Sequence, residues 1–391
     1  LEIASASTME HTRPQIAITG QRGDGETPAS VSGNKDASPS LAFYVRGLDM
    51  PGGAASTIDA ALALPQYDML LEQSAGGTTR NIVGGEVVGG STQWVLQFAA
   101  AGANGFAIGD VVGWVNLSGK MECLPVVNVN VVAHTITVAG DGATGGFSSP
   151  PLITDDIYGM RTYPIDQTAG ERSHITVHGQ LADTGIERLF QGCLGSVSFA
   201  DADGLLMATW AAQAQTWTAQ QNAAGAPVFA AFVPPNLGPV STRGARVLVC
   251  DEASWGVTSL GAGGSAGVAV ATAITGGFDM AVDIQPRAAA TGVNGRQGFV
   301  AVQSGCTSDV RVYHDGTTAA LLAGGSQTFG DGAALSFMDT QVISLLLQFG
   351  DQPGATIVLE IPAYQANATV GEEGGLATID LSGKGFRPDY G

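Results

Sequence analysis

A G-x-S-x-G pentapeptide at residues 263–267 is the most catalytic-looking pattern in this sequence, because it is the signature of the nucleophile turn of serine hydrolases. An acid and a base follow it in the hydrolase order, drawn from Asp279, Asp283, Asp309 and His314. That turn requires a strand before the serine and a helix after it. Here a Gly/Ala run surrounds the serine, and β-branched residues follow it. With 56 glycines in 391 residues, a chance match is expected, and we predict no catalytic residues.

Two other groupings have the residue types of a metal site. Asp201 and Asp203 have the carboxylate spacing of a calcium loop, but the glutamate that an EF-hand needs is missing, so a hairpin turn explains them better. His174 and His178 would share one face of a strand, but no third ligand is near. The cysteines form no C-x-x-C pair and lie 50 or more residues apart: Cys123, Cys193, Cys250 and Cys306. We therefore predict no metal, no cofactor and buried cysteines.

The composition favours antiparallel β structure that associates with itself. Charged residues make up only 13 % of the chain, against about 25 % in typical globular proteins, while the hydrophobic share of 45 % is ordinary. Many glycines and few charges suit a protein with many turns. A surface with so few charges is poorly protected against association. We favour a subunit that buries surface against its own copies over a Gly-rich β monomer.

The net charge of −19 argues against tight binding to nucleic acid or to anionic membranes. Basic residues number 16 against 35 acidic ones, and they form no cluster. A polyanionic surface suits a conduit for DNA, because repulsion keeps the cargo from sticking, but it also serves solubility alone. No apolar run of 18 residues predicts a membrane span, and the first residues lack the pattern of a signal peptide.

The strand signals divide the chain into a β domain that is interrupted by a second one. The first part of the chain contains one short helix of about ten residues between Pro65 and Gly76. The dense strand pattern of residues 82–158 predicts a compact five-stranded barrel. We favour an insert there, and part of the main wall is the alternative. The parts are an arm with at most one strand (residues 15–19) at 1–40, the start of the main domain at 41–81, a small barrel-like insert at 82–158, and the main domain at 159–391 with a Pro-rich connector at 222–242.

The main domain predicts short strands and hairpins. In the stretch 173–217, three strands surround a polar link at 183–185 and a turn at 201–204, while Gly192 and Gly195 predict a bulge or a close backbone approach. Further strands are predicted at 245–250, 278–284, 298–302 and 308–313. A closing hairpin is predicted from 341–349 and 355–362, ending at a proline.

The order of parts in 173–217 resembles the core of the tail tube proteins of long-tailed bacteriophages. Three other pieces are similar to that family: the strand and P-x-x-x-x-L-L helix of 41–77, the pair Tyr163-Pro164, and the closing hairpin with its last strand at 345–381. Together they cover about half of the chain. The barrel-like stretch and the Pro-rich connector depart from the minimal member of the family.

The resemblance implies a β-sandwich or barrel domain with one short flanking helix, plus a small inserted or appended β-barrel-like domain. It implies a structural virion protein, made in the host cytoplasm and built into the tail, that forms stacked hexameric rings with its own copies. Tape measure, terminator and distal tail proteins would be further partners, and double-stranded DNA would pass through without specific binding. The alternative is another virion part, a capsid decoration or receptor-binding protein. An esterase-like enzyme is the third hypothesis and the least favoured.

Acidic residues that flank the predicted hairpins are candidates for a repulsive lining or rim of the channel. Their alternative role is to solvate the turns in which they lie. These candidates are Asp183, Glu187, Asp201, Asp203, Asp351 and Glu360.

Overall fold

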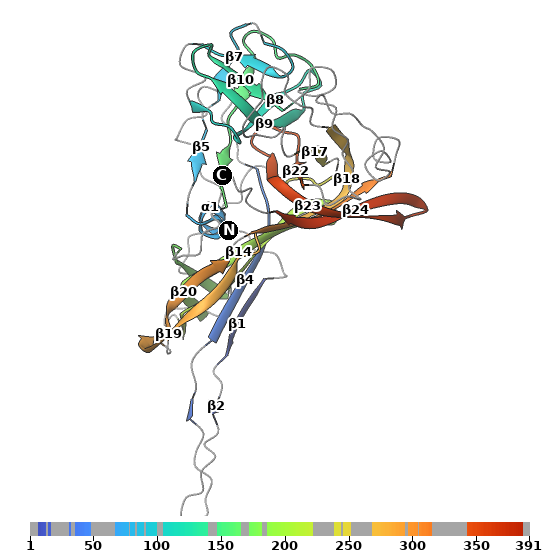
Figure 1. Ribbon diagram of the computed structural model, residues 1–391. Helices are drawn as coiled ribbons and strands as arrows, with labels where there is room; N and C mark the ends of the chain where they lie inside the picture. The colour runs from blue at the N-terminus through green and yellow to red at the C-terminus, as the bar shows by residue number, and fades with distance from the viewer. Residues whose placement is uncertain are drawn as a thin grey trace, which may run out of the picture.

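The computed structural model is mostly β, as predicted, with 24 strands and one helix in the part of the chain that it describes (Figure 1). The described residues are 7–12, 15–16, 31–32, 36–47, 67–77, 79–82, 84–89, 91–99, 105–139, 147–165, 172–181, 186–221, 238–243, 245–251, 268–293, 296–303, 305–314 and 342–385. The arrangement is a small barrel at the top of Figure 1, a larger body below it, and hairpins that project from the body.

The small barrel, called the insert from here on, is a closed ring of six strands. The strand order is β6-β11-β8-β9-β10-β7, and a bridge between Val87 and Phe98 joins the two ends. It therefore has one strand more than the five predicted, because two very short strands complete the ring. Its core is built around Trp114 and Phe147, with ring centroids 5.5 Å apart. The strands are β6 (Gly85–Glu86), β7 (Val95–Gln97), β8 (Val111–Val115), β9 (Met121–Asn130), β10 (Thr135–Val138) and β11 (Asp156–Tyr158).

The chain enters and leaves the insert at one place. Strands β5 (Arg80–Asn81) and β12 (Arg161–Thr162) pair antiparallel as a stem. Just above the stem the two segments touch: a Cβ on Gly84 would lie 2.1 Å from the Ile157 oxygen, and one on Gly159 would lie 1.9 Å from the Ile82 oxygen. Only glycine fits at both crossing points.

The body contains a second closed barrel, with the order β18-β17-β22-β23-β24-β21 and a final pairing of β21 with β18. Alternation along its strands separates two apolar clusters. Leu345 and Leu347 point into the body core, whereas Leu346 and Leu248 point outward into the core of the insert. The strands are β17 (Arg246–Asp251), β18 (Val268–Asp279), β21 (Cys306–Tyr313), β22 (Val342–Phe349), β23 (Ile357–Glu373) and β24 (Leu376–Gly385).

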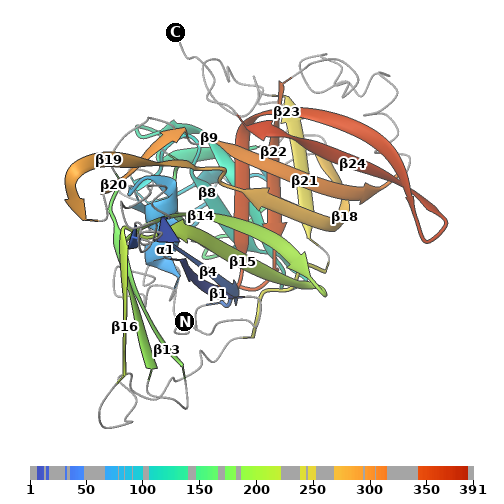
Figure 2. The ribbon, with the colours of Figure 1, turned by 90° about the horizontal axis from the view of Figure 1, so that it is seen from below.

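A four-stranded extension, called the wing, continues this barrel at β18. Its order is β14-β15-β4-β1, and β14 joins β18 through Ser198 and Phe199 (Figure 2). The insert lies between β4 and β14 in the sequence, so it interrupts the body. The wing strands are β1 (Thr8–Thr12), β4 (Asp36–Tyr44), β14 (Ile186–Ala202) and β15 (Leu205–Gln213).

The remaining strands form ribbons that extend from the body. The first half of β14 is flanked by β13 (Ile175–Leu181) and β16 (Thr216–Gln221). Two hairpins pair β19 (Asp283–Val293) with β20 (Arg296–Gln303) and β2 (Gln15–Ile16) with β3 (Val31–Ser32). The β2–β3 pair lies on an arm that runs down from β1 and β4 in Figure 1.

The helix α1 (Asp68–Ala75) packs on the wing and is bound to it by polar contacts. Gly76 ends it with a φ of 118°, as predicted. At its start, the Asp68 carboxylate accepts hydrogen bonds from Arg161 Nε at 2.5 Å and from the Tyr163 hydroxyl at 2.5 Å. In its middle, Gln73 is 1 % exposed and donates to the Cys193 oxygen at 2.6 Å. The Gln73 contact fixes the helix against β14, and the Asp68 contacts tie its start to the stem strand β12 and the residues after it.

Gln73 also explains one of the predicted glycines. Its Oε1 accepts hydrogen bonds from the Gly195 amide and from Trp210 Nε1, both at 3.2 Å. A Cβ on Gly195 would lie 2.3 Å from that indole nitrogen. The predicted close approach at Gly195 is confirmed, and Gly192, with a φ of 65° where the β13–β14 register shifts, forms the predicted bulge.

Replacing Gln73 by Leu should destabilise the protein by about 2–4 kcal/mol, because two buried N–H groups and one carbonyl lose their partners. Met69→Ala, on the same helix but at a side chain that is 64 % exposed, is the matched control and should change stability by less than about 0.5 kcal/mol. Urea unfolding followed by Trp fluorescence measures both. Equal effects of the two substitutions would contradict the anchoring role of Gln73.

Three expectations about strands are wrong. The arm holds more than one strand, since β1, β2, β3 and the start of β4 all lie in residues 1–40. The strand expected at 278–284 is broken between Asp279 and Asp283, where Ala281 has a φ of 46°. Strand β23 does not end at Pro362; the proline sits where the register with β22 shifts, so its missing N–H costs no ladder bond.

Candidate functional site

The residues with catalytic or metal-binding character do not converge in the described part of the chain. Ser265 lies outside the described residues, so the prediction about it stays a prediction. His178 Nε2 lies 3.3 Å from Glu187 Oε2, and burial lowers the pKa of His174. No group of three or more His, Cys, Asp or Glu side chains that could hold a metal occurs among the described residues.

The run Asp201-Ala202-Asp203-Gly204 is the predicted hairpin turn between β14 and β15. Asp203 and Gly204 have φ angles of 56° and 84°, as a two-residue type I′ loop requires. The Asp201 carboxylate accepts hydrogen bonds from the Gly204 amide at 3.1 Å and from the Thr242 hydroxyl. These carboxylates therefore serve the turn, and Asp203 remains exposed.

The acidic candidates that the structure describes are spread over the chain. Glu187 is 4 % exposed and lies fourteen positions before Asp201 on β14, roughly 45 Å away along an extended strand. Asp351 lies in the turn after β22 and contacts the insert, and Glu360 pairs across from Leu346 on the side that faces the insert. Asp183 lies outside the described residues. Only Asp201 and Asp203 lie together, at one end of the wing.

One side of the wing strands β4, β15 and β14, opposite the side that packs on the body core, carries mostly small and uncharged residues. Cross-strand register places Ala42, Thr209 and Ser198 in one row, and their neighbours two positions along each strand share that side. The opposite side of the same strands belongs to the body core. We call the side that carries this row the neutral face. Ala42 is buried on it, at 1 % exposed, and the other members are partly or fully exposed. The face consists of Ser38, Ser40, Ala42 and Tyr44 on β4, Leu205, Met207, Thr209, Ala211 and Gln213 on β15, and Ser196, Ser198, Ala200 and Ala202 on β14.

The neutral face so defined carries no charged residue, and charged residues limit it. At the start of β4, Asp36 lies on the same side and forms an ion pair with Arg296. The row through Ser198 continues to Asp279 on β18, Thr307 on β21 and Lys384 on β24. On the other side, β1 adds Thr8 and the exposed Glu10. Hydroxyl and methyl groups on a flat sheet offer a phosphate no cation, so the neutral face can adjoin a polyanion without binding it.

The sequence of β15 contains a pattern that predicts this uncharged surface. In β15 the apolar positions Leu206, Ala208 and Trp210 alternate with positions that carry no charge at all. A solvent-facing strand surface ordinarily carries charged residues. The absence of Lys, Arg, Asp and Glu from every second position of LLMATWAAQ was therefore the informative feature.

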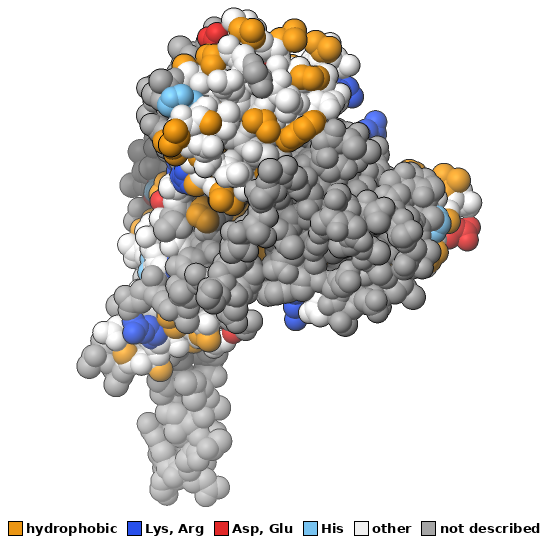
Figure 3. Space-filling model, turned by 45° about the horizontal axis from the view of Figure 1, so that its top comes forward, with side chains coloured by type: hydrophobic (Ala, Val, Ile, Leu, Met, Phe, Trp, Pro, Cys, Tyr) orange, Lys and Arg blue, Asp and Glu red, His pale blue; other side chains and the backbone are white. Residues whose placement is uncertain are grey.

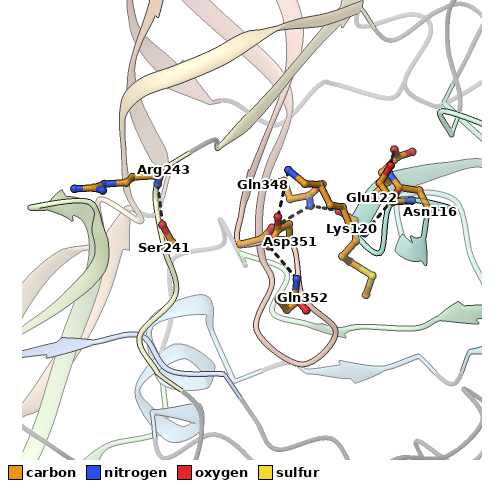
Figure 4. A network of polar contacts seen from close by, with 11 residues as sticks. Asn116, Lys120, Glu122, Ser241, Arg243, Gln348, Asp351 and Gln352 are labelled. Atoms are coloured by element: carbon orange, nitrogen blue, oxygen red, sulfur yellow. Dashed lines mark hydrogen bonds and ion pairs between the residues drawn. The ribbon is translucent and has the colours of Figure 1, made fainter.

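A buried glutamine holds the insert on the body (Figure 4). Gln348 is 3 % exposed; its Nε2 donates to the Met121 oxygen at 2.7 Å, and its Oε1 accepts from the Cys123 amide at 3.0 Å. The Met121 amide donates to the Asp351 oxygen at 2.6 Å, and Lys120 Nζ lies 3.7 Å from the Asp351 carboxylate. Together with Leu248 and Leu346, these contacts make the insert a docked unit.

The insert carries much of the exposed apolar surface. Of the thirteen large hydrophobic side chains that are exposed in the described residues, seven lie on it. Figure 3 shows hydrophobic side chains spread over its surface at the top of the view. These seven are Val88, Ile108, Leu117, Val131, Val132, Leu152 and Ile153.

The described cysteines are free and buried, as predicted: Cys123, Cys193 and Cys306. Burial raises the pKa of Cys193 to about 12 and that of Cys306 to about 11. Both therefore remain thiols at neutral pH and are poor nucleophiles.

No protein-family model matches this sequence, and no curated protein matches it. In the described part of the chain, no helix is both long enough and apolar enough to cross a bilayer.

Proposed function

We propose that this chain is the major tail tube subunit of a long-tailed bacteriophage, a structural virion protein without catalytic activity. The observation that carries the proposal is the neutral face: a three-stranded surface without charged residues in a chain of net charge −19. Six copies would place six such faces around a channel. Double-stranded DNA would slide past them, because no cation is positioned to hold its phosphates.

The width of the wing supports a channel of this kind. Four strands spaced about 4.8 Å apart span about 19 Å. Six wings would enclose a circumference of about 115 Å, which is a diameter of about 37 Å before strand tilt widens it. Such a channel admits a DNA duplex. Asp201 and Asp203, at the turn end of the wing, remain the candidates for an acidic rim.

The open strand edges support self-association. Among the described residues, β1 pairs only with β4, so its other edge is free for a neighbouring copy. Rings would stack through the part of the arm that carries β2 and β3, and the resemblance implies tape measure, terminator and distal tail proteins as the other partners. The protein would be made in the host cytoplasm and reside in the virion tail.

One observation favours the alternative, in which the chain is a capsid decoration or receptor-binding protein. The insert exposes apolar loops, with Val132 at 91 % and Leu117 at 80 %, as a surface that contacts another protein would. In the tube, these loops would face outward. The two functions differ in one result, because only a tube subunit forms hollow stacks from purified protein.

Sedimentation velocity at increasing protein and salt concentrations tests the proposal. Copies of net charge −19 repel one another, so raising the salt concentration from about 0.01 M to about 0.5 M should promote assembly by screening that repulsion. We expect a monomer at low salt and species of six copies or more at high salt. A single monomer peak at every protein and salt concentration would refute the tube function.

A further inference from the structure

The hairpin formed by β23 and β24 projects beyond the body barrel (Figures 1 and 2). Its partner strand β22 ends its pairing at Gln365, whereas β23 continues to Glu373. Residues 366–373 therefore pair with β24 on one side only, within the described chain. We call residues 366–377 the hairpin tip; the N–H and C=O groups of its outer strand edge have no strand partner among the described residues.

Three exposed apolar side chains gather at the hairpin tip. Leu376 is 57 % exposed and Val370 is 64 % exposed. Tyr313, which is 42 % exposed, pairs across from Thr378 at the base of the tip. Hydrophobic side chains appear at the right of Figure 3, beside histidine and acidic side chains. By register, Leu376 lies on the Tyr313 side of the ribbon and Val370 on the other, so both sides carry apolar surface.

An arginine clamp makes the hairpin tip rigid. Arg311 on β21 donates to the Asp380 carboxylate from Nε at 2.5 Å and from Nη2 at 3.0 Å, and Nη1 lies 3.2 Å from Glu373. One guanidinium thus joins three strands, and its single positive charge offsets one of the two acidic charges. A rigid element with reduced charge loses little entropy when a partner binds it.

The free edge of the hairpin tip lacks the protection that folded proteins give to exposed strands. Residues 366–371 contain no proline and no charged residue, and Glu372 and Glu373 follow at the end of the strand. In contrast, β19, which pairs only with β20 in the described chain, carries Pro286 and Arg287. Because unprotected edges add strands from other chains, the edge at the hairpin tip is suited to β-augmentation.

We propose that the hairpin tip docks on a second copy of this chain by adding its free edge to the neighbour's sheet; this inference rests on the proposed tube function. A projecting hairpin is not complementary to a second projecting hairpin, so it must bind a different surface of the neighbouring copy. Such head-to-tail contacts form a ring when the rotation between copies closes. The tip carries no cation free of acidic partners, which argues against nucleic acid as the occupant.

Lysine substitutions at the hairpin tip test this contact. Val370→Lys and Leu376→Lys place charges on exposed positions, so the monomer should fold with an unchanged melting temperature. Assembly at high salt should need at least a tenfold higher protein concentration. Val132→Lys, on the insert, is the matched control and should assemble like the wild type. If the wild type assembles and the tip variants assemble equally well, the inference is wrong while the tube function stands. If the wild type never assembles, the tube function fails.

Cross-linking shows what the tip touches. Thr369→Cys, an exposed position on the free-edge strand, is labelled with a benzophenone maleimide, and the wild type labelled in parallel reports the native cysteines. Irradiation of assembled protein should give dimers whose linked peptides lie in another copy. Dimers absent from an assembled sample, or a link that lies on the insert of the second copy, would overturn the proposed contact.

Discussion

Tubes that carry three lysines on the neutral face should retain duplex DNA, whereas wild-type tubes should not. The variant Ser38→Lys, Ala211→Lys, Ala200→Lys changes one exposed position on each of β4, β15 and β14. Six copies per ring would bring many ammonium groups to the channel wall, within reach of phosphates. Binding should fall by about 10³–10⁵ between about 50 mM and 200 mM salt if six to ten phosphates are contacted. Fluorescence anisotropy of a short labelled duplex measures it.

The control places the same three charges elsewhere. Leu117→Lys, Val132→Lys, Leu152→Lys puts them on exposed positions of the insert, which the proposal places outside the channel. This variant should bind DNA at least tenfold more weakly than the neutral-face variant. Equal binding by the two variants would show that position on the surface is irrelevant and that the neutral face does not line a channel.

Excision of the insert should leave the body insoluble unless the surface beneath it is made polar. The stem allows a clean cut, because Asn81 and Arg161 are paired neighbours that an Asn-Gly turn can join. The cut exposes Leu248 and Leu346, and each apolar side chain that loses its burial costs about 1.5–3 kcal/mol. The excised chain with Leu248→Thr and Leu346→Thr should regain solubility and assemble.

Two outcomes separate the possible roles of the insert. Assembly by the excised, repaired chain is expected if the insert lies on the outer wall. A repaired chain that is folded by circular dichroism but stays monomeric would instead make the insert part of the tube wall. Solubility is compared with the full-length chain carrying Gln352→Ala, an exposed control beside the docking site.

Local signals predicted the parts of the fold that depend on a few adjacent residues. The turn at Asp203-Gly204, the helix end at Gly76 and the close approach at Gly195 each follow from glycine or turn chemistry, and all are present. The alternation of apolar and polar residues along 196–199 likewise predicted a strand there, and these residues lie in β14. For the turn and the helix end, the structural reason lies in a few adjacent residues, whereas Gly195 is required by Trp210 on the neighbouring strand.

Features that depend on distant pairing were missed. Strand β4 begins in the segment DASPS, which has little β propensity and is held by pairing with β1 and β15. Strand β18 is rich in Ala and Gly and is held between β17 and β21. The acidic candidates were chosen by their nearness to turns, but Glu187 is buried beside His178, which only the fold determines.

Electron microscopy of the purified, assembled protein tests the central claim most directly. The tube function predicts hollow stacks of six-fold rings in high salt, and a reconstruction in which the neutral face of β4, β15 and β14 lines the channel while the insert lies outside. Solid aggregates, closed dimers or monomers under all conditions would contradict the tube function. Hollow rings in which the neutral face is buried between copies would contradict the role given to that face.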